Sequence, residues 1–143
     1  MNELKKPVLV IANGEFPYHT SALEPLKQER KIICIDGAAD RLKSFGKEPD
    51  IVIGDFDSTK IQNTERIKLW IETPNQNKTD LEKTFEWCVK NQIKEVILLG
   101  AGGQREDHLL GNLFLVSKFY NELNIEIITN YSKIICVSGS EII

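Results

Sequence analysis

The sequence predicts an α/β fold of three layers, in which a mostly parallel β-sheet carries helices on both faces. Short apolar runs rich in β-branched residues, among them Val8–Ala12 and Ile51–Ile53, are typical of strands that are covered on both faces. Segments with apolar residues at helical spacing lie between these runs. Because strands that alternate with helices form parallel sheets with right-handed crossovers, the pattern predicts a Rossmann-like arrangement.

The first half of the chain is expected to hold three strands and two helices. Ser21 can cap the first helix, and Gly46 lies where the second helix should stop. In chain order we expect a strand at Val8–Ala12, a helix from Ser21 to about Glu29, a strand at Lys31–Ile35, a helix at Ala38–Phe45 and a strand that ends at Gly54.

The second half continues the alternation. Apolar and polar residues alternate over Arg66–Glu72, which predicts a half-exposed or edge strand. Thr79 and Glu82 form a capping box that starts a helix. The remaining expected elements are a strand at Val96–Leu99, a long and largely apolar helix after His108, and strands at Ile125–Thr129 and Ile134–Val137.

Length and composition favour one soluble domain with a small-molecule ligand. The 143 residues are 41% hydrophobic and 27% charged, which allows a sizeable core. The formal net charge of −3 gives no basic surface for nucleic acid, and no apolar stretch is long enough to span a bilayer. The cysteines Cys34, Cys88 and Cys136 lie in apolar contexts, so we interpret them as small core residues of a cytoplasmic protein.

Polar loops follow five of the expected strand ends. Because the carboxyl ends of parallel strands share one edge of a sheet, these loops are expected to gather there, where α/β proteins bind ligands. The loops are Asn13-Gly14, Asp36-Gly37, Asp55–Ser58, Asn75–Asp80 and Gly100–His108.

Asp55 and Asp57 are the first candidate ligands for a metal. Two carboxylates so close in sequence repel each other unless a cation lies between them, and hard oxygen ligands suit Mg²⁺ or Mn²⁺. The alternative is that Asp57 or Ser58 only caps a short helix. Asp80 has the same two interpretations, since it is either a third metal or water ligand or a first-turn acid that complements a helix dipole.

The loop Gly100–Gly103, followed by Arg105, has the features of a phosphate site. It offers free backbone N–H groups, a helix N-terminus and a fixed positive charge, although glycine-rich turns are also common between strands and helices. Asp36 is either a turn residue or a partner for a ribose hydroxyl. His108 is given no role.

Four ordered motifs resemble those of the thiamine pyrophosphokinases across almost the whole chain. Pro49-Asp50 leading into Gly54-Asp55-Phe56-Asp57-Ser58 is similar to the most specific of the family's signatures. The other three are Asp36-Gly37-Ala38-Ala39-Asp40, Asn75-Gln76-Asn77-Lys78-Thr79-Asp80, and Gly100–His108 with Asn112 downstream. Ala38, Asn75 and Gln104 depart from the family pattern, and Asn75 is not assigned to the metal because it lacks a carboxylate.

The resemblance implies a domain organisation. Members of the family continue into a C-terminal β-sandwich that helps to complete the thiamine site, usually across a homodimer. We therefore expect residues 1–130 to form the ATP-binding catalytic α/β domain, and residues 131–143 to begin a C-terminal β segment that is largely absent from this truncated chain.

The resemblance also implies the chemistry, which is transfer of the pyrophosphoryl group of ATP to the hydroxyl of thiamine, giving thiamine diphosphate and AMP. Asp55, Asp57 and Asp80 would hold Mg²⁺, and Arg105 would stabilise charge on the phosphates. Gln76 and Thr79 would contact thiamine, and Asp80 or Asp107 would accept the hydroxyl proton. The expected contacts to ATP are Asn13, Gly14, Asp36, Gly37, Gly102, Gly103 and Arg105.

Three other functions stay open from the sequence. A diphosphokinase acting on a hydroxymethyl pterin would share the ATP and Mg²⁺ chemistry. A glycosyltransferase would use Asp55 and Asp57 to bind a nucleotide sugar through Mn²⁺, but would leave Asp80 and Gly100–Arg105 unexplained. A non-catalytic nucleotide-binding module is the third.

Overall fold

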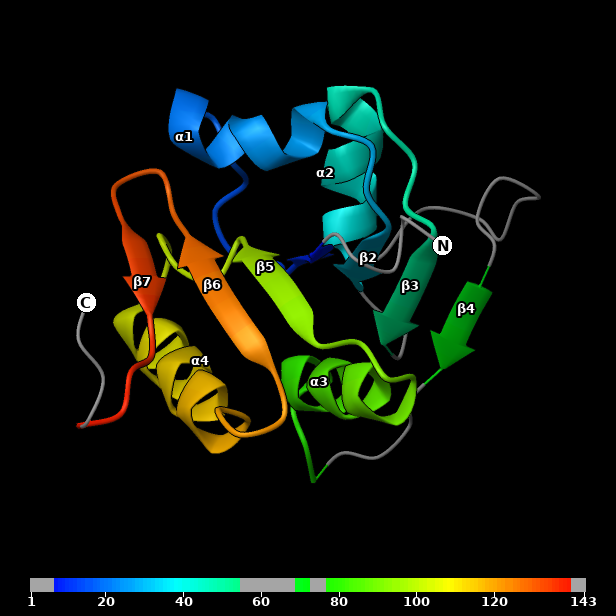
Figure 1. Cartoon of the computed structure of the whole chain (residues 1–143). Coiled ribbons are helices and arrows are strands. Elements are labelled where there is room, and N and C mark those ends of the chain that lie inside the picture. Colours follow the sequence, from blue (N-terminus) through cyan, green and yellow to red (C-terminus); the bar gives the residue numbers. More distant parts are fainter. Residues whose placement is uncertain (1–6, 55–68, 73–76, 140–143) are drawn as a thin grey trace.

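A seven-stranded sheet organises the chain, with the strand order β4-β3-β2-β1-β5-β6-β7 (Figure 1). The computed structural model describes residues 7–54, 69–72 and 77–139. Neighbouring strands are parallel except for β7, which is antiparallel to β6. The strands are β1 (Val8–Ile11), β2 (Ile32–Ile35), β3 (Ile51–Gly54), β4 (Leu69–Glu72), β5 (Glu95–Leu99), β6 (Asn124–Ile128) and β7 (Lys133–Ile135).

Helices pack against both faces of the sheet (Figure 1). The described helices are α1 (Thr20–Leu23), the 3₁₀ helix η2 (Glu24–Lys27), α2 (Ala38–Phe45), α3 (Asp80–Lys90) and α4 (Glu106–Lys118). Along β1, Val8 and Val10 belong to the core cluster under α3 and α4, whereas Leu9 and Ile11 belong to the cluster under α2 and η2. The predicted α/β class and mostly parallel sheet are therefore confirmed.

Two predicted helix boundaries are correct for the reasons given by the sequence. Thr79 is the N-cap of α3, where its hydroxyl accepts a hydrogen bond from the backbone N of Glu82 at 3.2 Å. Gly46 ends α2 in the left-handed conformation, with φ at +104°. The predicted edge position of the fourth strand is also confirmed, because β4 lies at one end of the sheet.

The first helix differs from the prediction. His19, not Ser21, is its N-cap, and the imidazole Nδ1 of His19 accepts a hydrogen bond from the backbone N of Ser21. The α-helix ends at Leu23, and a single 3₁₀ turn follows instead of helix to Glu29. Pro25 explains the change, because proline has no N–H to donate and disfavours helical geometry in the residue before it.

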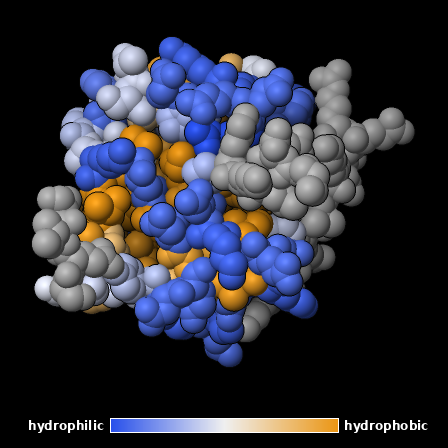
Figure 2. Space-filling model, viewed as in Figure 1, coloured by the Kyte–Doolittle hydropathy of each residue, from blue (hydrophilic) through white to orange (hydrophobic). Residues whose placement is uncertain are grey.

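The cysteines and the last helix complete the description of the core. Cys34 and Cys88 are buried, as predicted, whereas Cys136 is partly exposed. Helix α4 buries Val116 but exposes Leu110 and Phe114, the latter with 68% of its surface accessible. Figure 2 shows hydrophobic side chains at the surface on the α4 and β7 side of this face. Among the described helices, none has the length and apolar character needed to cross a membrane.

Candidate functional site at the carboxyl end of the sheet

The loops that follow β1 and β5 are joined by backbone hydrogen bonds. The backbone N of Gly14 donates to the carbonyl oxygen of Gly100, and that of Glu15 to the carbonyl oxygen of Gly102, both at 2.8 Å. A Cβ atom at position 14 would lie only 2.3 Å from the Gly100 oxygen, so glycine is required for this approach. Two loops separated by about 85 residues in sequence thus form one surface, since β1 and β5 are neighbours in the sheet.

The glycine loop itself is held in a defined shape. Gly100 and Gly103 have φ angles of +71° and +89°, which glycine adopts without strain. The side chain of Asn112, on α4, donates to the carbonyl oxygen of Ala101 at 2.8 Å. The loop leads directly into the N-terminus of α4, whose first-turn N–H groups favour an anionic ligand.

Arg105 precedes α4 and pairs with Asp107 in its first turn. Two guanidinium nitrogens of Arg105 donate to the two carboxylate oxygens of Asp107, at 3.1 and 2.7 Å. Both side chains are well exposed, and the hydrogen bond from Arg105 lowers the pKa of the Asp107 carboxyl. Arg105 is therefore an exposed cation whose charge is partly balanced by its neighbour.

Asp36 lies at the end of β2, beside the end of β3. Its side chain is nearly buried, with 6% of the residue accessible, and its backbone N donates to the carbonyl oxygen of Ile53 at 3.0 Å. Its φ of +47° is uncommon outside glycine, asparagine and aspartate. A Cβ atom on Gly54 would lie 3.3 Å from the Asp36 Cβ, so Asp36 packs against the residue that precedes Asp55.

Two further residues belong to this edge of the sheet and were not predicted. Arg41, on α2, donates to the carbonyl oxygen of Gly14 and thereby links α2 to the loop after β1. Asn130, which follows β6, donates from Nδ2 to Oε1 of Glu15 at 2.7 Å. Asn130 is a polar residue just after a predicted strand, so the rule that selected the five loops would also have selected it.

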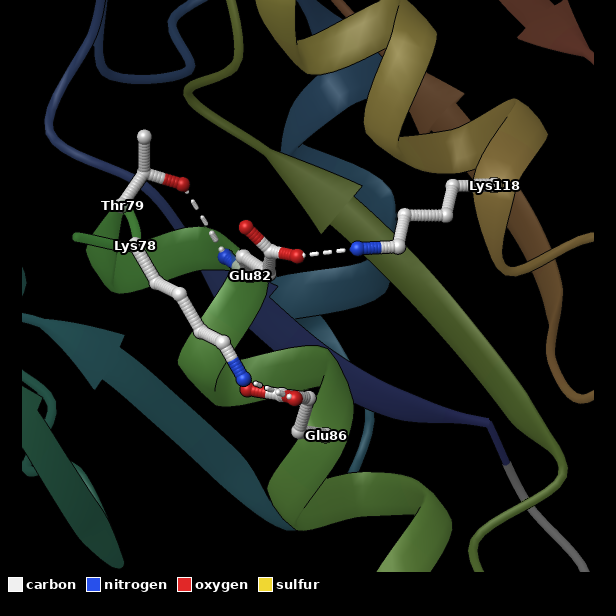
Figure 3. Close-up of polar contacts among 5 residues, drawn as sticks. All are labelled: Lys78, Thr79, Glu82, Glu86 and Lys118. Atoms are coloured by element: carbon white, nitrogen blue, oxygen red, sulfur yellow. Dashed lines mark hydrogen bonds and ion pairs between the residues drawn. The ribbon is translucent and has the colours of Figure 1, made fainter.

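The first turn of α3 makes contacts with a different part of the structure. Asp80 lies 3.6 Å from Nζ of Lys83 on the same helix. Glu82 pairs with Lys118 at the C-terminal end of α4, and Lys78 donates to Glu86 at 2.7 Å (Figure 3). These contacts connect the Asp80 turn to the end of α4, whereas the glycine loop and Arg105 precede its beginning.

The other predicted site residues can be placed only in part. Asn13 and Gly37 lie at the ends of β1 and β2 as expected, and Thr79 has its hydroxyl engaged as the α3 cap. Asp55, Asp57 and Gln76 lie outside the described residues. Within the ranges that the structure describes, no three His, Cys, Asp or Glu side chains are grouped as a metal site would require.

Two hollows in the surface lie at opposite ends of the strands. A cavity of about 150 Å³ lies between the glycine loop and the turn that joins β6 to β7. A larger hollow of about 490 Å³ lies around residues 120–125, where the chain enters β6, and thus at the opposite end of the strands. Of these two, the smaller cavity adjoins the candidate site. A third hollow, of about 380 Å³, is lined by the same turn between β6 and β7 together with His19 and Ser21.

The fold and these loops define a class of protein. A parallel α/β sheet with a glycine loop at a helix N-terminus, and with Asp36 at the end of a nearby strand, is an architecture for binding phosphorylated ligands. Residues 23–129 match the family model described as thiamin pyrophosphokinase, catalytic domain. The chain belongs to this family.

Individual relatives agree with the family match. The chain is 31% identical over 123 residues to thiamin pyrophosphokinase 1 of Caenorhabditis elegans, covering 78% of this chain and 50% of the relative. It is 32% identical over 91 residues to thiamine pyrophosphokinase of Bacillus subtilis strain 168, covering 60% of this chain and 42% of the relative. The chain thus spans about half the length of the curated relatives it matches.

Solved structures show the same fold. The crystal structure of thiamine pyrophosphokinase from Bacillus subtilis superposes with a TM-score of 0.69 at 28% identity, covering 86% of this chain and 60% of that one. Thiamin pyrophosphokinase from Candida albicans superposes with a TM-score of 0.67 at 16% identity, covering 89% of this chain and 59% of that one. At this low identity, the likeness shows a shared fold and nothing more.

Proposed function

We propose that this chain is the ATP-binding catalytic part of a thiamine diphosphokinase, and that it takes part in transfer of a pyrophosphoryl group from ATP to the hydroxyl of thiamine. The observation that carries the proposal is the joined surface of Gly14 and Gly100–Gly102 at the N-terminus of α4. The first-turn N–H groups of α4 and the helix dipole, which border this surface, suit a phosphate chain. Family membership disfavours the glycosyltransferase and the pterin kinase.

We assign ATP binding to both sides of this surface. Asn13 and Gly14 would contact the nucleotide from the loop after β1, and Gly102, Gly103 and Arg105 from the loop after β5. Asp36 and Gly37 would contact it from the end of β2. Arg105 would stabilise negative charge that develops on the transferred group, because its guanidinium is exposed and positioned by Asp107.

We propose Mg²⁺ as the metal, held by Asp55, Asp57 and Asp80. The donor chemistry fits, because carboxylate oxygens are the ligands that Mg²⁺ prefers. Asp80 is partly accessible and lies 3.6 Å from Nζ of Lys83, in the first turn of α3. When bound, Mg²⁺ would neutralise charge on the phosphates.

We propose that Asp80 or Asp107 accepts the proton of the acceptor hydroxyl. The hydroxyl of the acceptor must lose a proton as the new O–P bond forms, and the group that takes it acts as a general base. The pKa of Asp107 is lowered by Arg105, which makes that carboxylate a weaker base. A carboxylate that holds Mg²⁺ is weakened as a base in the same way, so Asp80 and Asp107 both stay candidates. Asp107 also positions Arg105.

The remaining features are proposed from the family. Gln76 and Thr79 would face thiamine, and a β-sandwich following a three-layer, Rossmann-like domain of residues 1–130 would complete the acceptor site. We propose a homodimer in the full-length enzyme, with the exposed pair Leu110 and Phe114 as one apolar contact. The free cysteines of the described residues support a cytoplasmic location.

Calorimetric titration with ATP, with and without Mg²⁺, tests the nucleotide half of the proposal. We expect Mg²⁺-dependent binding that Asp55→Asn weakens, and we expect AMP, not ADP, as product when thiamine is added to the full-length enzyme. There, Asp57→Asn should lower turnover by on the order of 10²-fold or more. Binding without turnover in the full-length enzyme would favour the non-catalytic module, and near-normal turnover of Asp57→Asn would remove the metal assignment.

A further inference from the structure

The cavity of about 150 Å³ beside the glycine loop has a mixed lining. The carboxylate of Glu15 and the amide of Asn130 are its polar side, and Leu109, Tyr131 and Ile134 are its apolar side. Ligand cavities for drug-sized molecules span roughly 300–1,000 Å³, so this one has room for part of a nucleotide only. The residues that line the cavity therefore decide which part of a nucleotide it can bind.

The carboxylate of Glu15 is fixed in place against the glycine loop. Asn130 is 8% accessible, and its Oδ1 accepts hydrogen bonds from the backbone N of Tyr18 at 2.7 Å and of His19 at 2.9 Å. With Asn130 so held, its Nδ2 donates to Oε1 of Glu15. A Cβ atom on Gly103 would lie 2.9 Å from Oε2 of Glu15, so this oxygen faces the loop.

A fixed carboxylate at this position repels the phosphates of a nucleotide and accepts hydrogen bonds from hydroxyl groups. The phosphate chain is consequently directed away from Glu15. Hydroxyls of a ribose are suitable donors to Oε2 of Glu15.

The aromatic ring of Tyr131 is available at the rim of the cavity. Tyr131 is 75% accessible, and its hydroxyl is 3.0 Å from that of Tyr18. This contact anchors the turn between β6 and β7 to the segment before α1. A ring that is held at its hydroxyl end can stack on a planar ligand with little loss of conformational freedom, and such stacking does not depend on the base.

We propose that this cavity binds the nucleoside end of ATP, with the ribose hydroxyls on Glu15 and the base on the ring of Tyr131. The inference rests on the proposed function, because it assumes that ATP occupies the adjoining glycine loop. It adds two residues for nucleoside recognition and fixes the direction of the nucleotide, with the ribose beside Gly103 and the phosphates farther from Glu15.

The test compares Mg²⁺-dependent binding of ATP, 2′,3′-dideoxy-ATP and inorganic triphosphate to the chain by calorimetry. Glu15→Gln should weaken ATP by about tenfold, the effect expected of one lost hydrogen bond to a charged group, and should leave inorganic triphosphate unchanged or tighter. The wild type should bind dideoxy-ATP about as weakly as Glu15→Gln binds ATP, with no further loss when the two changes are combined. Glu122→Gln, an exposed residue beyond α4, is the matched control.

The ring is tested with a second pair of variants. Tyr131→Ala should weaken ATP by about fivefold or more, whereas Tyr131→Phe, which keeps the ring, should stay close to the wild type. Equal losses of ATP and inorganic triphosphate in Glu15→Gln, or full affinity for dideoxy-ATP, would overturn the inference. So would a loss of thiamine binding in Glu15→Gln without loss of ATP.

The binding experiments distinguish failure of the proposed function from failure of this inference. Absence of ATP binding by the wild type would reject the proposed nucleotide site and this inference with it. ATP binding that depends on Asp55 but not on Glu15 or Tyr131 would reject this inference alone.

Discussion

Replacement of Gly14 by alanine tests the contact on which the candidate site is built. The added Cβ would lie 2.3 Å from the carbonyl oxygen of Gly100 and 2.8 Å from that of Gly102. Favourable contact between such atoms needs about 3.5 Å, so the two loops must separate by about 1 Å. Both 2.8 Å hydrogen bonds between the loops would then exceed hydrogen-bonding distance.

The magnitude follows from these two effects. Each lost hydrogen bond removes about 0.5–1.5 kcal/mol, and the crowding of a well-packed region costs roughly 1–3 kcal/mol more. We therefore expect Gly14→Ala to lower the free energy of unfolding by about 2–6 kcal/mol, as measured by urea denaturation with an unchanged m-value. ATP affinity should fall with it, because the loops no longer form one surface.

Gly111→Ala is the matched control. Gly111 is an exposed residue within α4, and a Cβ added there meets no atom within 4 Å. Alanine in place of glycine inside a helix should raise stability by about 0.5–1 kcal/mol and leave ATP binding unchanged. If Gly14→Ala unfolded within about 0.5 kcal/mol of the wild type and bound ATP normally, the close approach of the two loops would be wrong.

Three further predictions concern individual side chains. Thr79→Ala should lower stability by about 1 kcal/mol through loss of the α3 cap, and Thr79→Ser should restore most of it in the same denaturation assay. A thiol reagent should label Cys136 alone in the folded protein and all three cysteines after unfolding. The reason is that burial shields the thiols of Cys34 and Cys88 and raises their pKa values, that of Cys88 to about 12. Arg105→Gln should raise the pKa of Asp107 toward its ordinary value, as measured by NMR titration. In the wild type, the lowered pKa of Asp107 stabilises the folded state at pH values above the ordinary carboxyl pKa. This stabilisation is lost as the pH falls through the lowered pKa.

The fold followed from local properties of the sequence. Buried parallel strands need continuous apolar runs, and helix ends need particular caps, so Ile51–Gly54, Thr79 and Gly46 were identifiable without a structure. The first helix is shorter than predicted, because Pro25 interrupts it. Its true N-cap, His19, is outside the residue types that usually cap helices.

The candidate site, like the fold, was predicted from the sequence only in part. The residue types at the strand ends indicated phosphate chemistry, and the family motifs gave each a proposed role. Sequence alone did not show that Asp107 neutralises part of the charge of Arg105, since neither residue type predicts its partner. It also did not show that the Thr79 turn is tied to the far end of α4 by the pair of Glu82 and Lys118.

The strands and helices, their parallel alternation and the residue types of the loops therefore follow from the sequence. These depend on residues that are near one another in the chain. The tertiary structure alone decided that Gly14 lies against Gly100 and that Asn130, more than a hundred residues away, holds Glu15. Such contacts depend on which strands become neighbours in the sheet, and that order is set by the packing of the whole core and not by any one segment.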